Sequence, residues 1–231
     1  MRFRNAFFCL VVVVGFGLFS GCDRADKPAP MENKTKADPA FLRGTIVCVG
    51  DSLTEGAGVA EEQAYPALLK QKLGADGHLY AVINAGISGE TSSGTLSRIN
   101  WILTLKPDIV ILETGANDGL RGTDPKLTQK NITEIVRILK AKGVIVLLAG
   151  MEMLRNMGTD YTTAFREIYT NVAKEETVRR IPFFLNGVAG NPRLNQPDGI
   201  HPTAEGYKVI TEKIYPYVLE AIGDFEGGGR Q

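Results

Sequence analysis

The chain has 231 residues, 44% of them hydrophobic, which is enough for one sizeable core and indicates one domain rather than two. Its 26 basic and 26 acidic side chains cancel, and no basic run stands out. We therefore expect no nucleic-acid partner.

The N-terminus has the pattern of an export signal. Two early arginines precede an apolar stretch, residues 6–19, that is too short to span a bilayer comfortably. The next residues, FSGC, resemble the lipobox of bacterial lipoproteins, in which the cysteine is lipidated; ordinary cleavage and an uncleaved anchor are the alternatives. We predict a signal peptide over residues 1–21, lipidation of Cys22 and a place in the bacterial cell envelope, on the periplasmic side in a Gram-negative organism.

The mature chain divides into a tether, a domain and a tail. Residues 22–43 are polar, contain prolines and lack apolar periodicity, which predicts a flexible lipid-anchored tether. The folded domain is predicted over residues 44–223 and a glycine-rich disordered tail over 224–231. Cys48 stands alone in an apolar run, so we expect a small buried thiol and no disulfide framework.

Short apolar runs alternate with longer amphipathic segments throughout the domain. The runs are rich in Val and Ile and apolar on both faces, as in strands of a covered parallel sheet: 45–50, 79–84, 108–114, 144–150 and 181–184. Helices are predicted over residues 62–74, 92–105, 125–142, 160–178 and 204–222. This alternation predicts a doubly wound α/β fold with right-handed crossovers and a site at the carboxyl ends of its strands.

Residues that can carry chemistry follow these predicted strands. Ser52 comes after the first strand, Gly89 after the second and Asn117 after the third. Asp198 and His201 come just before the last helix. We expect all five to converge on one edge of the sheet, because the carboxyl ends of parallel strands meet there.

Ser52 is a candidate nucleophile if a base can take its proton. His201 lies between an Asp-Gly turn and a proline, which restricts its backbone. Asp198 is near enough in sequence to hold the imidazole in one tautomer. The alternatives are a helix-capping role for Ser52, a turn role for Asp198 and a packing role for His201. His78, in a polar turn, is expected to be a surface-loop residue.

Acyl transfer also needs donors aimed at the developing oxyanion. The Ser52 N–H can supply one, the Gly89 N–H can approach a ligand closely, and Asn117 carries a side-chain amide. Taken singly, Gly89 is better explained as a turn glycine and Asn117 as a loop residue that tolerates left-handed geometry.

Four blocks, GDSLTEG, NAGISGETSSG, ETGANDGLRG and DGIHP, occur in this order along the chain. Together they resemble the GDSL, or SGNH, hydrolase family over about residues 45–222. The likeness is nearest to the group of bacterial arylesterases, acyl-CoA thioesterase I and lysophospholipase L1. It implies a flavodoxin-like three-layer α/β/α sandwich with a five-stranded parallel sheet, and neither a metal nor an organic cofactor.

The resemblance also implies roles for residues. It assigns a catalytic triad to Ser52, Asp198 and His201, and an oxyanion hole to Ser52, Gly89 and Asn117. The implied activity is hydrolysis of carboxylic acyl esters or thioesters through an acyl-enzyme, with a small acyl ester, a thioester or a lysophospholipid as substrate. Residues 151–161, rich in Met and Leu, either form an acyl groove or cover the core.

Two other classes of function compete with this interpretation. A metal-dependent phosphoesterase would use Asp51, Asp118, Asp198 and His201 as hard ligands, although the sequence has no recognised metal spacing. A non-catalytic ligand-binding lipoprotein would need no nucleophile, base and oxyanion donors together.

Overall fold

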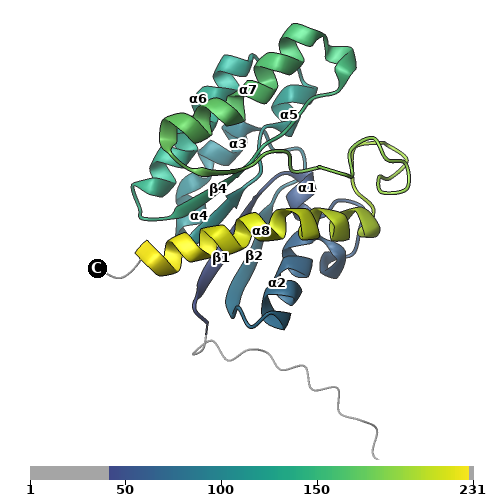
Figure 1. The fold of residues 1–231 in the computed structure, drawn as a ribbon. Helices are drawn as coiled ribbons and strands as arrows, with labels where there is room; N and C mark the ends of the chain where they lie inside the picture. Colours follow the sequence, from purple (N-terminus) through teal and green to yellow (C-terminus); the bar gives the residue numbers. More distant parts are fainter. Residues whose placement is uncertain (1–41, 229–231) are drawn as a thin grey trace, which may run out of the picture. The chain divides into compact units, whose positions relative to one another are not determined.

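The computed structural model describes residues 42–228, which contain a five-stranded parallel sheet with strand order β2-β1-β3-β4-β5 (Figure 1). The strands are β1 (Gly44–Gly50), β2 (Tyr80–Gly86), β3 (Ile109–Leu112), β4 (Ile145–Ala149) and β5 (Arg179–Ile181). The interior strand β1 is buried on both faces from Ile46 to Val49, which explains why its sequence is apolar throughout rather than alternating.

Helices cover both faces of the sheet. One face carries α2 (Tyr65–Ala75) and α8 (Ala204–Gly228), which pack against each other and cross the strands (Figure 1). The other carries α3 (Ser92–Ser97), α4 (Ile99–Thr104), α6 (Pro125–Lys140) and α7 (Thr159–Glu176). Short elements lie between them: α1 (Ser52–Glu55), η2 (Glu61–Gln63), α5 (Ala116–Leu120) and η3 (Arg155–Met157). The predicted three-layer α/β/α fold with a five-stranded parallel sheet is therefore confirmed.

The fifth strand differs from its prediction. It was expected at residues 181–184, but β5 spans Arg179–Ile181 and shares only Ile181 with that run. As an edge strand it pairs with β4 alone, so two arginines can occupy it. The apolar run that suggested a strand continues beyond it, where Phe184 is buried in the core.

Two helices also differ from expectation. The segment predicted as one helix over 92–105 forms α3 and α4, which meet at Arg98 (φ −105°, ψ 10°). The last helix runs past the expected domain boundary at 223, as far as Gly228. Its final turns are held at the start of the sheet, where Phe225 packs edge-on against the ring of Tyr80 and Tyr80 Oη donates to Glu226 at 3.1 Å.

The predicted signal peptide, Cys22, the tether as far as residue 41 and residues 229–231 lie outside the described part of the chain. Within residues 42–228, no helix has the length and apolar character needed to cross a membrane.

Candidate active site

The sheet register brings three strand ends to one edge. Gly50, the last residue of β1, is aligned with Gly86 of β2, and Val49 is aligned with Leu112 of β3. The strand order reverses between β1 and β3, the point at which open α/β sheets bind ligands. The segments that follow these strands carry Ser52, Gly89 and Asn117, so the predicted convergence of these segments is confirmed.

A tight corner presents Ser52 at this edge. Ser52 is the first residue of α1, and the cap of that helix is Asp51, whose Oδ1 accepts from the Leu53 N–H at 3.0 Å. The capping role considered for Ser52 therefore belongs to Asp51. Gly50 has no room for a side chain, because a Cβ there would lie 2.1 Å from Thr54 Oγ1 and 2.4 Å from Glu113 Oε2.

Ser52, His201 and Asp198 form one continuous hydrogen-bonded chain. His201 Nε2 lies 2.9 Å from Ser52 Oγ, and His201 Nδ1 lies 2.7 Å from Asp198 Oδ2. These separations are within the reach required of a nucleophile, its base and a group that orients the base. The His201 side chain is 26% exposed, so the site is open to solvent on one side.

Asp198 combines the two roles considered for it from sequence. Its Oδ1 accepts from the backbone N–H groups of Ile200 at 2.9 Å and His201 at 3.0 Å, which closes the turn. Its Oδ2 faces the imidazole. The hydrogen bond to the His201 side chain is the largest of the effects that lower the pKa of Asp198 to about 2, so this carboxylate stays ionised across the neutral range.

Gly89 and Asn117 lie on the other two segments. Gly89 has φ +76°, a left-handed conformation that favours glycine, and its carbonyl accepts from Arg121 Nη2 at 2.9 Å. The Asn117 amide donates to Asp51 Oδ2 and to the Glu90 carbonyl, both at 3.1 Å. These contacts link the loops after β1, β2 and β3.

A buried ion pair stabilises the loop that carries Gly89. Arg98 donates from Nε and Nη2 to the two carboxylate oxygens of Glu90, each at 2.7 Å, and from Nη2 to the Ala85 carbonyl at 2.7 Å. The two side chains are only 13% and 7% exposed. Sequence analysis missed this pair, whose only signal was the acidic residue directly after Gly89.

A second missed residue is Glu113, which lies directly beneath the Ser52 corner. The sequence placed it in the third strand, but β3 ends at Leu112 and Glu113 is fully buried at the strand end. Burial, followed by repulsion from Asp51, raises its pKa well above the usual range. An acidic residue that ends an otherwise apolar run was the signal available in the sequence.

Other residues considered from sequence lie elsewhere or are engaged differently. His78 lies two residues before β2, at the opposite edge of the sheet. Cys48 is a free thiol in the core, where burial raises its pKa to about 12. Asp118 accepts from the N–H and hydroxyl of Ser92 at 2.7 and 2.6 Å. Across residues 42–228, no three His, Cys, Asp or Glu side chains are arranged to hold a metal ion.

The Met- and Leu-rich segment after β4 divides between the two roles considered for it. Met151 is buried in the core. Met153 is half-buried against α5, where a Cβ on Gly119 would lie 2.1 Å from its sulfur. Leu154 is 52% exposed, so its side chain is available to a ligand.

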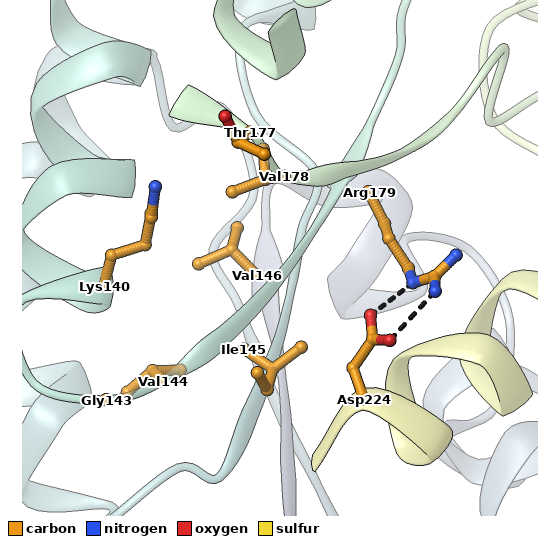
Figure 2. A pocket seen from close by; sticks show the side chains of 9 residues that line it. All are labelled: Lys140, Gly143, Val144, Ile145, Val146, Thr177, Val178, Arg179 and Asp224. Atoms are coloured by element: carbon orange, nitrogen blue, oxygen red, sulfur yellow. Dashed lines mark hydrogen bonds and ion pairs between the residues drawn. The ribbon is translucent and has the colours of Figure 1, made fainter. Parts of the chain in front are cut away.

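A pocket of about 290 Å³ lies away from these residues, where β4 and β5 begin (Figure 2). Arg179 donates to both carboxylate oxygens of Asp224 there, as the dashed lines in Figure 2 show, and Lys140 Nζ donates to the Glu176 carbonyl. Its charged groups thus have partners within the protein, and it contains none of the residues that converge near Ser52.

The three-layer fold, with Ser52 directly after its first strand, is that of an α/β/α hydrolase. The chain matches the GDSL-like lipase/acylhydrolase family over residues 48–209, and it belongs to that family. The resemblance found in the sequence blocks is thereby confirmed. The chain is a serine esterase, a hydrolase of carboxylic esters.

Individual relatives agree with this assignment. The chain is 40% identical to esterase TesA of Pseudomonas aeruginosa over 173 residues. The aligned region covers 74% of this chain and 86% of that protein. The chain is also 37% identical over 174 residues to thioesterase 1/protease 1/lysophospholipase L1 of Escherichia coli K12, covering 75% of this chain and 82% of that one.

Solved structures give the same result. A crystal structure of TesA superposes with a TM-score of 0.75 at 39% identity, over 77% of this chain and 99% of that chain. AlinE4, described as an SGNH-hydrolase family esterase, superposes with a TM-score of 0.66 at 36% identity, over 77% of this chain and 96% of that chain.

Proposed function

We propose that this esterase acts through Ser52 as nucleophile, His201 as general base and acid, and Asp198 as the residue that orients His201. The observation that carries the proposal is the unbroken chain from Asp198 through His201 to Ser52, with contacts of 2.7 and 2.9 Å. Three functional groups from two distant segments have no structural reason to align in this order.

The reaction follows from this arrangement. Ser52 Oγ attacks the acyl carbonyl while His201 Nε2 takes its proton, and the same proton passes to the leaving group as the tetrahedral intermediate collapses. A water molecule, deprotonated by His201, then attacks the carbonyl of the acyl-enzyme, and His201 returns the proton to Ser52 Oγ as the acid leaves. Asp198 stays ionised and stabilises the imidazolium that forms in each half-reaction.

The oxyanion is assigned to three donors: the N–H groups of Ser52 and Gly89 and the side-chain amide of Asn117. Ser52 begins α1, so its N–H has no acceptor within the helix. Gly89 projects no side chain between its backbone and a ligand. Asn117 lies within hydrogen-bonding distance of Asp51, the neighbour of Ser52. Donors fixed before the reaction stabilise the developing charge without reorganisation.

The substrate class is proposed to be an acyl ester with an apolar acyl chain, including thioesters and lysophospholipids. Support comes from large apolar side chains exposed on the segments that lie at the site edge. We call this set the apolar rim: Ile87 (47% exposed), Leu120 (40%), Leu154 (52%) and Ile200 (36%). Each lies within three residues of a site residue or on the loop after β4, and exposed apolar patches of this kind mark ligand or lipid contacts.

The cellular place is proposed from the sequence. Cleavage before Cys22 and its lipidation would anchor the enzyme to a membrane of the bacterial envelope through residues 22–43, outside the cytoplasm. Cytosolic acyl-CoA would then not be the main substrate. Replacing Cys22 with Ala is expected to move the enzyme from the membrane fraction to the soluble fraction with its esterase activity intact.

The catalytic assignment is tested with Ser52→Ala in the full chain. Loss of the nucleophile is expected to lower kcat for p-nitrophenyl butyrate by about 10⁵-fold or more. A fluorophosphonate probe should label wild type at Ser52 and leave the variant unlabelled. Wild-type turnover by Ser52→Ala would refute the assignment.

The substrate class is tested with p-nitrophenyl esters of increasing chain length beside acyl-CoA and lysophospholipid. Leu154→Ser is expected to lower kcat/KM for a decanoyl ester about 10-fold relative to an acetyl ester, since one apolar contact discriminates by about 1–3 kcal/mol. The matched control is Leu127→Ser, because Leu127 is also exposed but lies on α6. An equal effect of both variants would argue against an acyl contact at the apolar rim.

A further inference from the structure

Two buried carboxyl groups beneath Ser52 have no part in the triad. Asp51 is 1% exposed and Glu113 is fully buried. Glu113 Oε2 accepts from the Asp51 N–H at 3.2 Å and from the Thr54 hydroxyl at 2.9 Å. Burying a carboxyl pair is costly, so its presence at this corner requires an explanation.

The pair continues into the proposed oxyanion site. Asp51 Oδ2 accepts from one N–H of the Asn117 amide, and the second N–H of that amide donates to the Glu90 carbonyl. One side of the amide is thus fixed by a carboxylate, and the other side by a neutral carbonyl. The neutral carbonyl is the weaker of the two acceptors. The amide N–H that donates to it is therefore the one that can donate to a negatively charged oxyanion instead.

Each carboxyl group of the pair accepts from two donors, but the surroundings of the two groups differ. Asp51 accepts from the Leu53 N–H and from Asn117, two donors that stabilise a carboxylate, and the positive form of His201 favours its ionisation. Glu113 Oε1 is buried with no hydrogen-bond partner among residues 42–228. Desolvation raises the pKa of Asp51 only to about 6, whereas that of Glu113 is raised well above its usual range. Burial therefore favours the neutral form of Glu113 more strongly than the neutral form of Asp51.

We propose that the Asp51 carboxylate positions the Asn117 amide for the oxyanion, and that Glu113 holds Asp51 in place by accepting from its backbone N–H. Both are positioning residues, because neither touches the reacting atoms. The inference rests on the proposed function, in which Asn117 is an oxyanion donor. A carboxylate acceptor also polarises the amide, which strengthens its remaining N–H as a donor.

Replacements of Glu113 test whether its acceptor oxygen is needed beneath Asp51. Glu113→Gln keeps an oxygen that can accept from the Asp51 N–H and the Thr54 hydroxyl, so kcat for p-nitrophenyl butyrate is expected to stay within about 3-fold of wild type. Glu113→Leu removes both interactions and is expected to lower kcat at least 10-fold with KM within 2-fold. Equal losses in Glu113→Gln and Glu113→Leu, both still labelled by fluorophosphonate, would overturn the proposal.

A double-mutant cycle tests whether Asp51 acts through Asn117. Asp51→Asn keeps a helix-capping side chain and removes the charge, and is expected to lower kcat about 10-fold at constant KM. Asn117→Ala is expected to cost on the order of 10²-fold. If Asp51 acts through the amide, the double variant will lose little more than Asn117→Ala alone, whereas independent sites would give additive free-energy losses. Additive losses would overturn the positioning role.

The controls distinguish this inference from the proposed function. Asp108→Asn changes a carboxylate that accepts from the Thr45 N–H at 2.7 Å, at the other end of β1, and is expected to leave kcat unchanged. Wild-type activity in Asn117→Ala would refute both the oxyanion assignment and the inference. Additive losses alongside a deficient Asn117→Ala would refute the inference and leave the triad and oxyanion donors standing.

Discussion

At the carboxyl edge of the sheet, Arg98 and Glu90 form a bidentate ion pair whose side chains are 13% and 7% exposed. At the amino edge, Arg179 pairs with Asp224, and these side chains are 40% and 42% exposed. The chemistry of the two pairs is the same, but their surroundings differ. The buried pair holds the loop of Gly89 in one conformation, whereas the exposed pair borders a solvent-facing pocket (Figure 2). Charges at the first edge are fixed by burial, and those at the second are screened by water.

Removing His201, the proposed base at the carboxyl edge, gives the largest expected effect. His201→Ala leaves Ser52 without a proton acceptor and is expected to lower kcat by about 10⁵-fold or more. Steady-state assays with p-nitrophenyl butyrate measure this loss of kcat. An unchanged melting temperature shows that the variant is still folded. A loss below 10-fold would mean that another group serves as base.

Breaking the buried ion pair between Arg98 and Glu90 is expected to have the second-largest effect. Arg98→Ala leaves Glu90 charged in a site with little water and is expected to lower the free energy of unfolding by about 3 kcal/mol or more. Urea unfolding measures the change. Because the Gly89 loop loses its support, kcat should fall as well. A variant as stable as wild type would show that Glu90 reaches water or another partner.

The buried carboxyl pair predicts a pH-dependent difference in stability. Burial raises the pKa of Asp51 to about 6, above the value of about 3.9 for an unfolded Asp. The folded protein therefore binds this proton more tightly than the unfolded chain, and the stabilisation is lost as pH rises through 6. Asp51→Asn is expected to melt above wild type at pH 8, with the difference narrowing between pH 6 and pH 4. A constant difference would contradict the assigned charge state.

The exposed pair at the amino edge gives the smallest effect. Arg179→Ala is expected to change the free energy of unfolding by less than about 1 kcal/mol, because solvent already screens its interactions with Asp224 and Glu220. Activity should be unchanged. Destabilisation equal to that of Arg98→Ala would remove the contrast between the two edges.

The parts of the site that follow from strand topology could be predicted from the sequence. The segments that follow parallel strands lie together at one edge of the sheet. The apolar strand pattern was therefore enough to predict that Ser52, Gly89 and Asn117 lie at the same edge. The Asp198–His201 spacing fitted one turn, and the structure brings that turn to Ser52. Their catalytic roles stay predictions until they are tested.

The supporting groups could not be predicted in the same way. The role of Glu113 depends on its burial and on its contact with Asp51, which lies 62 positions earlier in the chain. The spacing of apolar residues in the sequence indicates neither of these. Arg98 lies in what the sequence suggests is one helix, and its guanidinium joins the end of β2 to the loop that follows it. The fifth strand was misplaced because an edge strand needs no apolar run.

Both ends of the described chain lie at the amino edge of the sheet, opposite the Ser52 corner. Arg43, directly before β1, is bonded to Glu226 near the end of α8 at 3.2 Å. A short engineered linker could therefore join the two ends, and new termini could be opened in a surface turn such as the one at Gly143. The same geometry means that attachment of either end to a bead or a display scaffold would leave the esterase site facing the solution.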